Sequence, residues 1–255
     1  IAAGHTPGDI RDYVAAGSWI ALRRGVYCTT ERFHASRWSP RSEHLLHIQA
    51  AALAVRRNTV VSCWSAALLS GLPLPGRLHG RPPELVTLST AVGRGRRLPG
   101  IELLVAPLPP DQVVPDPEGT TTTPARTAVD LAVRAAATDP DDVLAVVDSV
   151  LHQGLASRAE LVRVADQFRG WPGSAHARML IELADAKAES PLESHSRALF
   201  VRAGIPMPES QVEMYDQRGR LIGRVDFLWR EQRTIGEADG RLKYGSIEVL
   251  YQEKQ

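Results

Sequence analysis

The sequence is short of cysteine and of long apolar runs, and each shortage excludes a class of protein. Two cysteines, Cys28 and Cys63, among 255 residues provide neither a disulfide framework nor the paired thiols of a zinc finger. No apolar run approaches the ~20 residues needed to cross a bilayer, and no basic-then-apolar leader is present. We therefore expect a cytoplasmic protein with no membrane segment. Because the chain begins at Ile1 and not at methionine, we also expect that N-terminal residues are missing.

The net charge of +1 hides an uneven distribution of charge along the chain. Residues 1–100 carry 13 basic and 5 acidic side chains, whereas residues 101–190 carry 7 and 14, and residues 191–255 carry 10 of each. All but 3 of the 30 basic residues are arginine, which is typical of a high-GC genome and is weak evidence of phosphate binding. The near-neutral total therefore does not exclude a DNA-binding protein, because the first 100 residues alone carry a net charge of +8.

The N-terminal pattern predicts a helix followed by a short hairpin. Thr6-Pro7-Gly8-Asp9 can cap and begin a helix, Gly17 can end it, and residues 19–28 read as two strands around Arg23-Arg24-Gly25. A helix and a basic hairpin form the second half of a winged helix-turn-helix, so we expect one over residues 1–38 with its first helix truncated. The alternative is a winged helix that serves only protein contact or dimerisation.

Candidate DNA contacts are the arginines of this helix, of its wing and of a later Gly-Arg-rich loop. They are Arg11, Arg23, Arg24, Arg94, Arg96 and Arg97. Asp9 and Asp12, on the same helix as Arg11, weaken this prediction because they repel phosphate.

Residues 39–188 predict a mixed, mainly helical middle domain. The expected elements are helices at 41–57 and 62–70, strands at 84–89 and 101–106, a proline-rich connection at 107–117, and four helical segments from Pro124 to residue 188. Asp130 is expected to cap or to pair with Arg126 one turn earlier.

Residues 189–255 predict a separate α/β domain. Ser190-Pro191-Leu192-Glu193 begins a helix that ends at Gly204, and strands follow at 211–215, 221–229 and from about residue 233. The whole chain is thus expected to be an α+β multi-domain protein that is incomplete at its C-terminus. The abrupt sequence near Ser246 is a second place where residues could be missing.

A tight hairpin centred between Glu231 and Gln232 would place Asp226 opposite Glu237. Facing carboxylates on neighbouring strands repel unless a positive group lies between them, and a divalent cation such as Mg²⁺ would meet that need. The alternative is that Glu237 and Asp239 are solvated charges of an edge strand, neutralised by Arg224. A shift of one residue in strand register would also separate the facing pair.

Three C-terminal segments resemble the endonuclease domain related to very-short-patch-repair enzymes, of the PD-(D/E)xK superfamily. They are Ser190 to Ser194, Gly223 to Phe227 and Glu237 to Tyr244. The resemblance implies Asp226 and Glu237 as ligands of Mg²⁺ or Mn²⁺, Asp239 as an accessory acid and Glu193 as the helical acid of a catalytic site. Asp239 stands where the superfamily has lysine, and Lys243 is the nearest substitute. Glu193 has an alternative role in the helix cap, as the fourth residue of a Ser-x-x-Glu capping box.

The N-terminal and middle parts resemble AbiEi-type antitoxins and related actinobacterial proteins. The resemblance lies in the helix and wing at 6–28, in Ser62 to Ala67 and in Thr122 to Leu131. It implies DNA and a toxin or other protein as partners. Our leading hypothesis is a DNA-binding protein with a metal-dependent endonuclease domain. The alternatives are a transcriptional regulator or antitoxin-like protein with a degenerate nuclease fold, and a purely structural partner protein.

Overall fold

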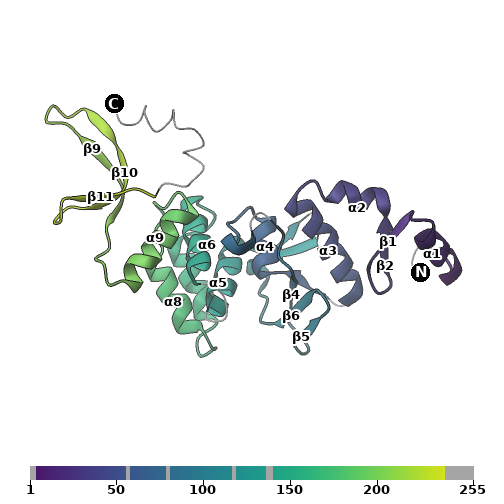
Figure 1. Ribbon diagram of the computed structural model, residues 1–255. Coiled ribbons are helices and arrows are strands. Elements are labelled where there is room, and N and C mark those ends of the chain that lie inside the picture. The colour runs from purple at the N-terminus through teal and green to yellow at the C-terminus, as the bar shows by residue number, and fades with distance from the viewer. Residues whose placement is uncertain (1–3, 56–57, 79–80, 117–118, 136–139, 239–255) are drawn as a thin grey trace, which may run out of the picture. The chain divides into compact units, whose positions relative to one another are not determined.

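The computed structural model describes residues 4–55, 58–78, 81–116, 119–135 and 140–238. They form an α+β protein with three separate β-sheets, in two compact units that divide between Leu131 and Ala132. We refer to the part up to Leu131 as unit 1 and to the part from Ala132 as unit 2. Figure 1 labels the elements along the chain. The expected domain boundaries, after residues 38 and 188, stay predictions.

Unit 1 begins with the predicted helix and hairpin. Helix α1, Pro7–Ala15, starts in a capping box, in which the Thr6 hydroxyl accepts the Asp9 N–H at 3.2 Å and the Asp9 carboxylate accepts the Thr6 N–H at 2.8 Å. Strands β1, Trp19–Arg23, and β2, Val26–Thr29, pair antiparallel around a turn in which Gly25 has a φ of +77°. The local geometry that the sequence predicted is therefore present, while its use as a DNA-binding wing stays a prediction.

Three helices follow, and the first of them was not predicted. Helix α2, Thr30–Ser36, is capped by Thr29, and α3, Pro40–Val55, and α4, Cys63–Leu69, match the helices expected from the sequence. Ser62 occupies the N-cap position of α4, but its hydroxyl accepts a hydrogen bond from Ser89 at 2.8 Å and does not cap the helix.

A six-stranded mixed sheet forms the centre of unit 1. Its order is β5-β6-β4-β3-β8-β7, and β4 pairs parallel with β6. The strands are β3, Val60–Val61; β4, Val86–Thr90; β5, Arg96–Leu98; β6, Ile101–Val105; β7, Val113–Asp116; and β8, Gly119–Thr122. Short 3-10 turns lie at Gly76–Leu78 and Pro110–Gln112. Helices α3 and α4 pack against β4, and Ile48, Leu88 and Leu103 belong to the buried core between them.

The expected proline-rich connection at 107–117 is partly wrong, because it contains strand β7 of a β7–β8 hairpin. Pro115 pairs with Thr120 in that hairpin, at the outer edge of the sheet. Proline lacks the N–H that a central strand must donate, but an edge strand has one side free and tolerates it.

The helical segments from Pro124 onward agree with the sequence. Helix α5 is Pro124–Arg134, α6 is Pro140–His152, α7 is Arg158–Asp166 and α8 is Ser174–Leu183. Arg126 donates from Nε to Asp130 at 2.8 Å, one turn later, and also binds the oxygens of Pro107 and Gln112. Asp130 therefore pairs with Arg126, as predicted, in a buried structural contact of unit 1.

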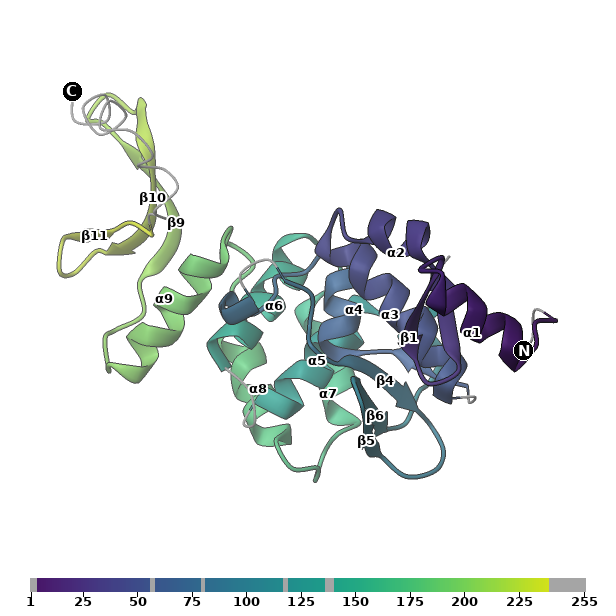
Figure 2. The ribbon, with the colours of Figure 1, turned by 45° about the vertical axis from the view of Figure 1, so that its right-hand side comes forward.

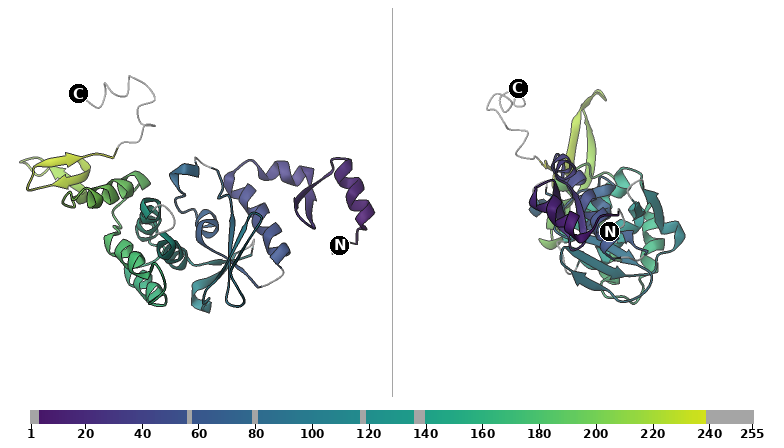
Figure 3. Two further views of the ribbon diagram at one scale, coloured as in Figure 1. Left: turned by 60° about the horizontal axis from the view of Figure 1, so that its bottom comes forward. Right: turned by 90° about the vertical axis from the view of Figure 1, so that its right-hand side faces the viewer.

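The C-terminal helix and meander of unit 2 also match the prediction. Helix α9, Pro191–Arg202, precedes strands β9, Glu209–Tyr215; β10, Leu221–Trp229; and β11, Thr234–Gly236, which form a sheet in the order β11-β10-β9. Figures 2 and 3 show this sheet next to α9. Phe200 of α9 makes edge-to-face contacts with Phe227 and Trp229, at centroid distances of 5.3 and 5.1 Å, so α9 and the sheet share a small aromatic core.

No helix among the residues that the structure describes is both long and apolar enough to cross a bilayer.

Candidate functional site

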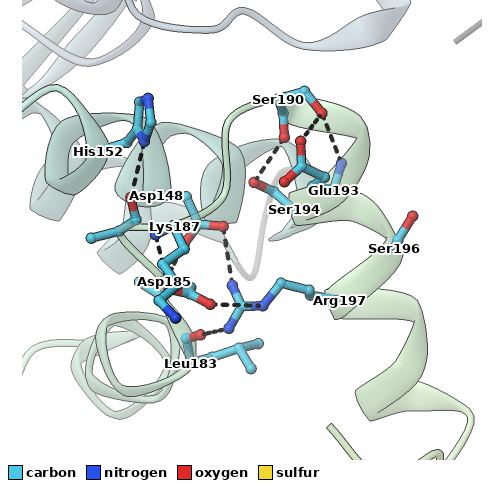
Figure 4. Close-up of polar contacts among 12 residues, drawn as sticks. Asp148, His152, Leu183, Asp185, Lys187, Ser190, Glu193, Ser194, Ser196 and Arg197 are labelled. Atoms are coloured by element: carbon cyan, nitrogen blue, oxygen red, sulfur yellow. Dashed lines mark hydrogen bonds and ion pairs between the residues drawn. The ribbon is translucent and has the colours of Figure 1, made fainter. Parts of the chain in front are cut away.

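Glu193 lies at the N-terminal end of α9, where local sequence dictates its first contacts. Ser190 is the N-cap, and its hydroxyl accepts the Glu193 N–H at 3.2 Å and donates to Glu193 Oε1 at 2.8 Å. The N–H of Glu189 donates to Glu193 Oε2 at 3.2 Å. The side chain is buried, with 4% of the residue exposed. The capping role proposed from the sequence is thus present, and Figure 4 shows the Ser190–Glu193 contacts.

Asp226 lies in the middle of β10, and Gln211 lies opposite it on β9. The neighbouring pairs are Val225 with Val212 and Phe227 with Ser210, which places Gln211 directly across from Asp226. Gln211 Nε2 donates to Asp226 Oδ1 at 3.0 Å and to Glu193 Oε2 at 2.8 Å. Two acids expected in one site, Glu193 and Asp226, are therefore joined by a single side-chain amide that the sequence analysis did not single out.

Gln211 is unusual in two further ways. Its φ is +53°, a left-handed conformation that side chains other than glycine and asparagine adopt at a cost. Its amide oxygen, Oε1, is buried and accepts no hydrogen bond from the described residues. The second feature leaves the oxygen unsatisfied on the same amide whose nitrogen binds two carboxylates.

The predicted register between β10 and β11 is confirmed. Phe227 pairs with Gly236, Leu228 with Ile235 and Trp229 with Thr234. Carried one residue further, the same register would set Asp226 opposite Glu237.

Strand β11 itself ends at Gly236, and Glu237 is exposed just beyond it. The backbone N–H of Ala238 donates to Asp226 Oδ2 at 2.8 Å, so the chain after Glu237 stays against Asp226. Asp239 and Lys243 lie outside the described residues.

Arg224 is held by an acid at the start of α9. Its Nη2 lies 2.7 Å from Glu189 Oε2, and both side chains are partly exposed. Arg224, two residues from Asp226 on β10, is thus paired with Glu189.

Helix α9 is fixed in unit 2 by a buried ion pair one turn after Glu193. Arg197 Nη1 lies 3.2 Å from Asp148 Oδ2 of α6, and Arg197 Nη2 donates to the Leu183 carbonyl. The N–H of Asp185 donates to Asp148 Oδ1 at 2.7 Å (Figure 4). Burial raises the pKa of Asp148 to about 6, although Arg197 acts in the opposite direction. This cluster joins α6, α9 and the segment between α8 and α9.

The candidate DNA-contact arginines of α1 and of the β1–β2 turn have different environments. Arg23 donates to the carbonyls of Pro99 and Gly100 at 2.6 and 3.1 Å, and burial lowers the pKa of its guanidinium. Arg24, next in the turn, is exposed, as is Arg11 on α1. Arg23 therefore ties the hairpin to the β5–β6 turn, while Arg24 is open to solvent.

The remaining candidate arginines lie on or beside β5, the edge strand of the six-stranded sheet. Arg94, Arg96 and Arg97 are all exposed, and Arg97 Nη2 lies 3.6 Å from Glu102 Oε1 on the neighbouring strand.

On α1, the hydrogen bonds from Thr6 hold the pKa of Asp9 below its ordinary value, so the acid stays ionised there.

No protein-family model matches the chain. Two curated proteins of Mycobacterium tuberculosis, "Uncharacterized protein MT2308" of strain CDC 1551 / Oshkosh and "Uncharacterized protein Rv2248" of strain H37Rv, are each 35% identical to it over 127 residues. The match spans 50% of this chain and 43% of each relative, less than half of the length of those proteins. The similarity links the chain to mycobacterial proteins and assigns no activity to it.

Proposed function

We propose that the chain is a DNA-binding protein whose C-terminal domain is a metal-dependent endonuclease that hydrolyses DNA phosphodiester bonds. The observation that carries the proposal is the convergence of Glu193 and Asp226 on the Gln211 amide. Acids from a helix and a strand come together there, and the β10–β11 register, extended by one residue, would bring Glu237 opposite Asp226.

The residues present fit a hard divalent cation. Among the described residues no group of three His, Cys, Asp or Glu side chains is placed to hold a metal. The Glu193–Asp226 pair nevertheless offers carboxylate oxygens, and Gln211 adds a buried amide oxygen that accepts no hydrogen bond from the described residues. Mg²⁺ prefers one or two carboxylates and keeps several waters, so this set of oxygen donors suits it, or Mn²⁺.

Each residue has a role that follows from its position. Asp226 and Glu237 would hold the ion, and Glu193 would complete the set of acids from the helix side. Bound Mg²⁺ would supply the Lewis acidity that activates water and offsets charge on a phosphodiester. The Ser190 cap and the Arg197–Asp148 pair orient Glu193, and the N–H of Ala238 orients Asp226.

Nicking of supercoiled plasmid DNA tests the proposal. Wild-type protein should nick in Mg²⁺ or Mn²⁺ and not in EDTA. Asp226→Asn and Glu193→Gln should each lower the rate at least about 100-fold, because even groups that only support metal ligands are worth about 10–100-fold. Glu231→Gln, an exposed acid in the β10–β11 turn, is the matched control. Nicking that survives both site substitutions would refute the assignment of the site.

DNA binding is tested separately from cleavage. Arg24→Ala should weaken binding to all sequences and reduce the slope of log affinity against log salt by about 1, as expected for loss of one phosphate contact. Arg163→Ala, an exposed arginine of α7, is the control. A salt-independent interaction, or none, would favour the structural partner protein over any DNA-directed function.

A second candidate function is a transcriptional regulator or antitoxin-like protein with a degenerate nuclease fold. One observation favours it: the Gln211 amide already donates a hydrogen bond to each carboxylate, so the pair has a partner without a cation. Salt-sensitive DNA binding without cleavage in Mg²⁺ or Mn²⁺ would select this function, with a toxin or another protein as the further partner.

A further inference from the structure

We propose that Gln211 is a third cation ligand at the Glu193–Asp226 pair, and that its amide turns over between the metal-free and metal-bound protein. The inference rests on the proposed function, which requires a cation at this pair. Gln211 lies on β9, and neither the nuclease-like motifs nor the β10–β11 register predicted a metal-binding residue on that strand.

In the described structure the nitrogen end of the amide takes the place of a positive charge. Glu193 and Asp226 approach each other closely enough that one Nε2 group reaches both, at 2.8 and 3.0 Å. An amide NH₂ has two hydrogens, and here each hydrogen has its own carboxylate oxygen. Gln211 thereby offsets the repulsion between two acids that would otherwise face each other without any partial positive charge between them.

The oxygen end of the same amide has no such role. Oε1 is buried and accepts no hydrogen bond from the described residues, although a buried amide oxygen is ordinarily satisfied. The amide nitrogen and oxygen have nearly the same size, so a half-turn of the group exchanges their positions with little change in shape. Such a turn would bring an oxygen to the point from which Nε2 now reaches both carboxylates.

Rotation of the Gln211 amide is unfavourable without a cation and favourable with one. Without a cation it would replace two hydrogen bonds by contacts between an amide oxygen and two carboxylates. With a divalent cation at the pair, the oxygen becomes a neutral third ligand, and side-chain amide oxygens are ordinary ligands of hard cations. Two carboxylates and one neutral oxygen also match the +2 charge of the ion.

Calorimetric titration of the full chain with MnCl₂ tests the ligand. Gln211→Leu should weaken Mn²⁺ binding by about tenfold or more. Gln211→Glu should lower the metal-free melting temperature, because a third carboxylate joins the pair, yet bind Mn²⁺ at least as tightly as wild type. The melting temperature of Gln211→Glu should therefore rise more on Mn²⁺ addition than that of wild type. Gln217→Leu, in the exposed β9–β10 turn, is the matched control.

The NMR signals of the Gln211 side-chain NH₂ test the rotation of the amide in wild-type protein, and variants serve only to assign them. They are assigned by their loss in Gln211→Leu or Gln211→Glu. Mg²⁺ should shift them as the hydrogen bonds to Glu193 and Asp226 break, whereas the Gln217 signals should stay in place. Gln211 signals that do not shift at saturating Mg²⁺ would refute the proposed rotation of the amide.

The outcomes separate this inference from the proposed function. If wild type and Gln211→Leu bind Mn²⁺ equally while Asp226→Asn does not, Gln211 is only a structural donor, and the proposed function stands without it. If wild type binds no Mn²⁺, the metal-dependent function fails, and the third ligand fails with it.

Discussion

The buried carboxylate of Asp148 should make unit 2 less stable as the pH rises from about 4 to 7. Asp148 is 1% exposed, and burial raises its pKa to about 6 from the ordinary value of 3.8. Between these two values the folded protein holds a proton that the unfolded chain has released. Folding is therefore favoured at the acidic end of this range, and the advantage is lost as Asp148 ionises in the folded state.

The size of the effect follows from the two pKa values. A difference of about 2 pKa units corresponds to about 3 kcal/mol over the full range, most of it between about pH 4 and pH 7. Solvent screening does not reduce this figure much, since the carboxylate is buried. The ion pair with Arg197 at 3.2 Å limits the cost of ionisation, so Arg197→Met should destabilise unit 2 by about 3–5 kcal/mol at pH 7 and by less at pH 5.

The measurement compares wild type with Asp148→Asn, which has no proton to release at this position. The free energy of opening is obtained from amide hydrogen exchange of α6 peptides, corrected for the intrinsic exchange rate at each pH, because a chain of two units need not unfold in one step. The difference between wild type and Asp148→Asn should change by about 2 to 3 kcal/mol from pH 4 to pH 7. A difference that stays constant with pH would refute the reasoning.

Two further predictions concern backbone geometry and a buried histidine. A Cβ at Gly173, where φ is +86°, would lie 1.9 Å from the Val133 carbonyl oxygen, whereas at Gly170, with φ of +83°, it would meet nothing within 4 Å. Chemical denaturation should therefore show a loss of about 1 kcal/mol for Gly170→Ala and about 3 kcal/mol or more for Gly173→Ala, and equal losses would contradict the overlap. In unit 1, burial lowers the pKa of His44 to about 4, and its Nε2 lies 2.8 Å from Ser65 Oγ. Since the unfolded histidine binds its proton near pH 6.5, stability should fall by about 3 kcal/mol as the pH drops from 6.5 to 4, and His44→Gln should lack this dependence in the same exchange measurement on α3 peptides.

Local signals were sufficient to predict the β10–β11 pairing. The turn around Glu231 and Gln232 is short, and a short turn leaves one register that keeps Phe227 on the covered face. The same reasoning predicted α9 from Ser190 and Glu193, because a capping box depends on neighbours within one turn.

The role of Gln211 could not be predicted in the same way. Counting from the β9–β10 turn, where Leu221 pairs with Tyr215, would place Ser210 opposite Asp226. The pairing shifts by one residue between Leu221 and Gly223, and this irregularity brings Gln211 to Asp226 instead. The third partner, Glu193, comes from α9, whose position depends on packing that no local pattern encodes.

Unpredicted elements in unit 1 have a similar explanation. Helix α2 is as short as α4, at seven residues, but no glycine follows it to mark its end, as Gly71 does for α4. Strand β7 contains Pro115, which ordinarily argues against a strand. An edge position makes the proline acceptable, but the edge is known only once the order of the sheet is known.

The Arg197–Asp148 pair also bears on how the chain can be divided. The helix that supplies Glu193 shares an aromatic core with the β-meander through Phe200, and it shares a buried charge pair with α6. A fragment starting at residue 189, where the sequence suggests a domain boundary, would keep the guanidinium and discard both carboxylates that face it, Asp148 and Asp185. A fragment ending at residue 188 would retain those two acids but lack Arg197. The two fragments thus carry opposite members of one buried ion pair. Mixing them would test whether α9 can dock onto α6 when the two helices belong to separate chains.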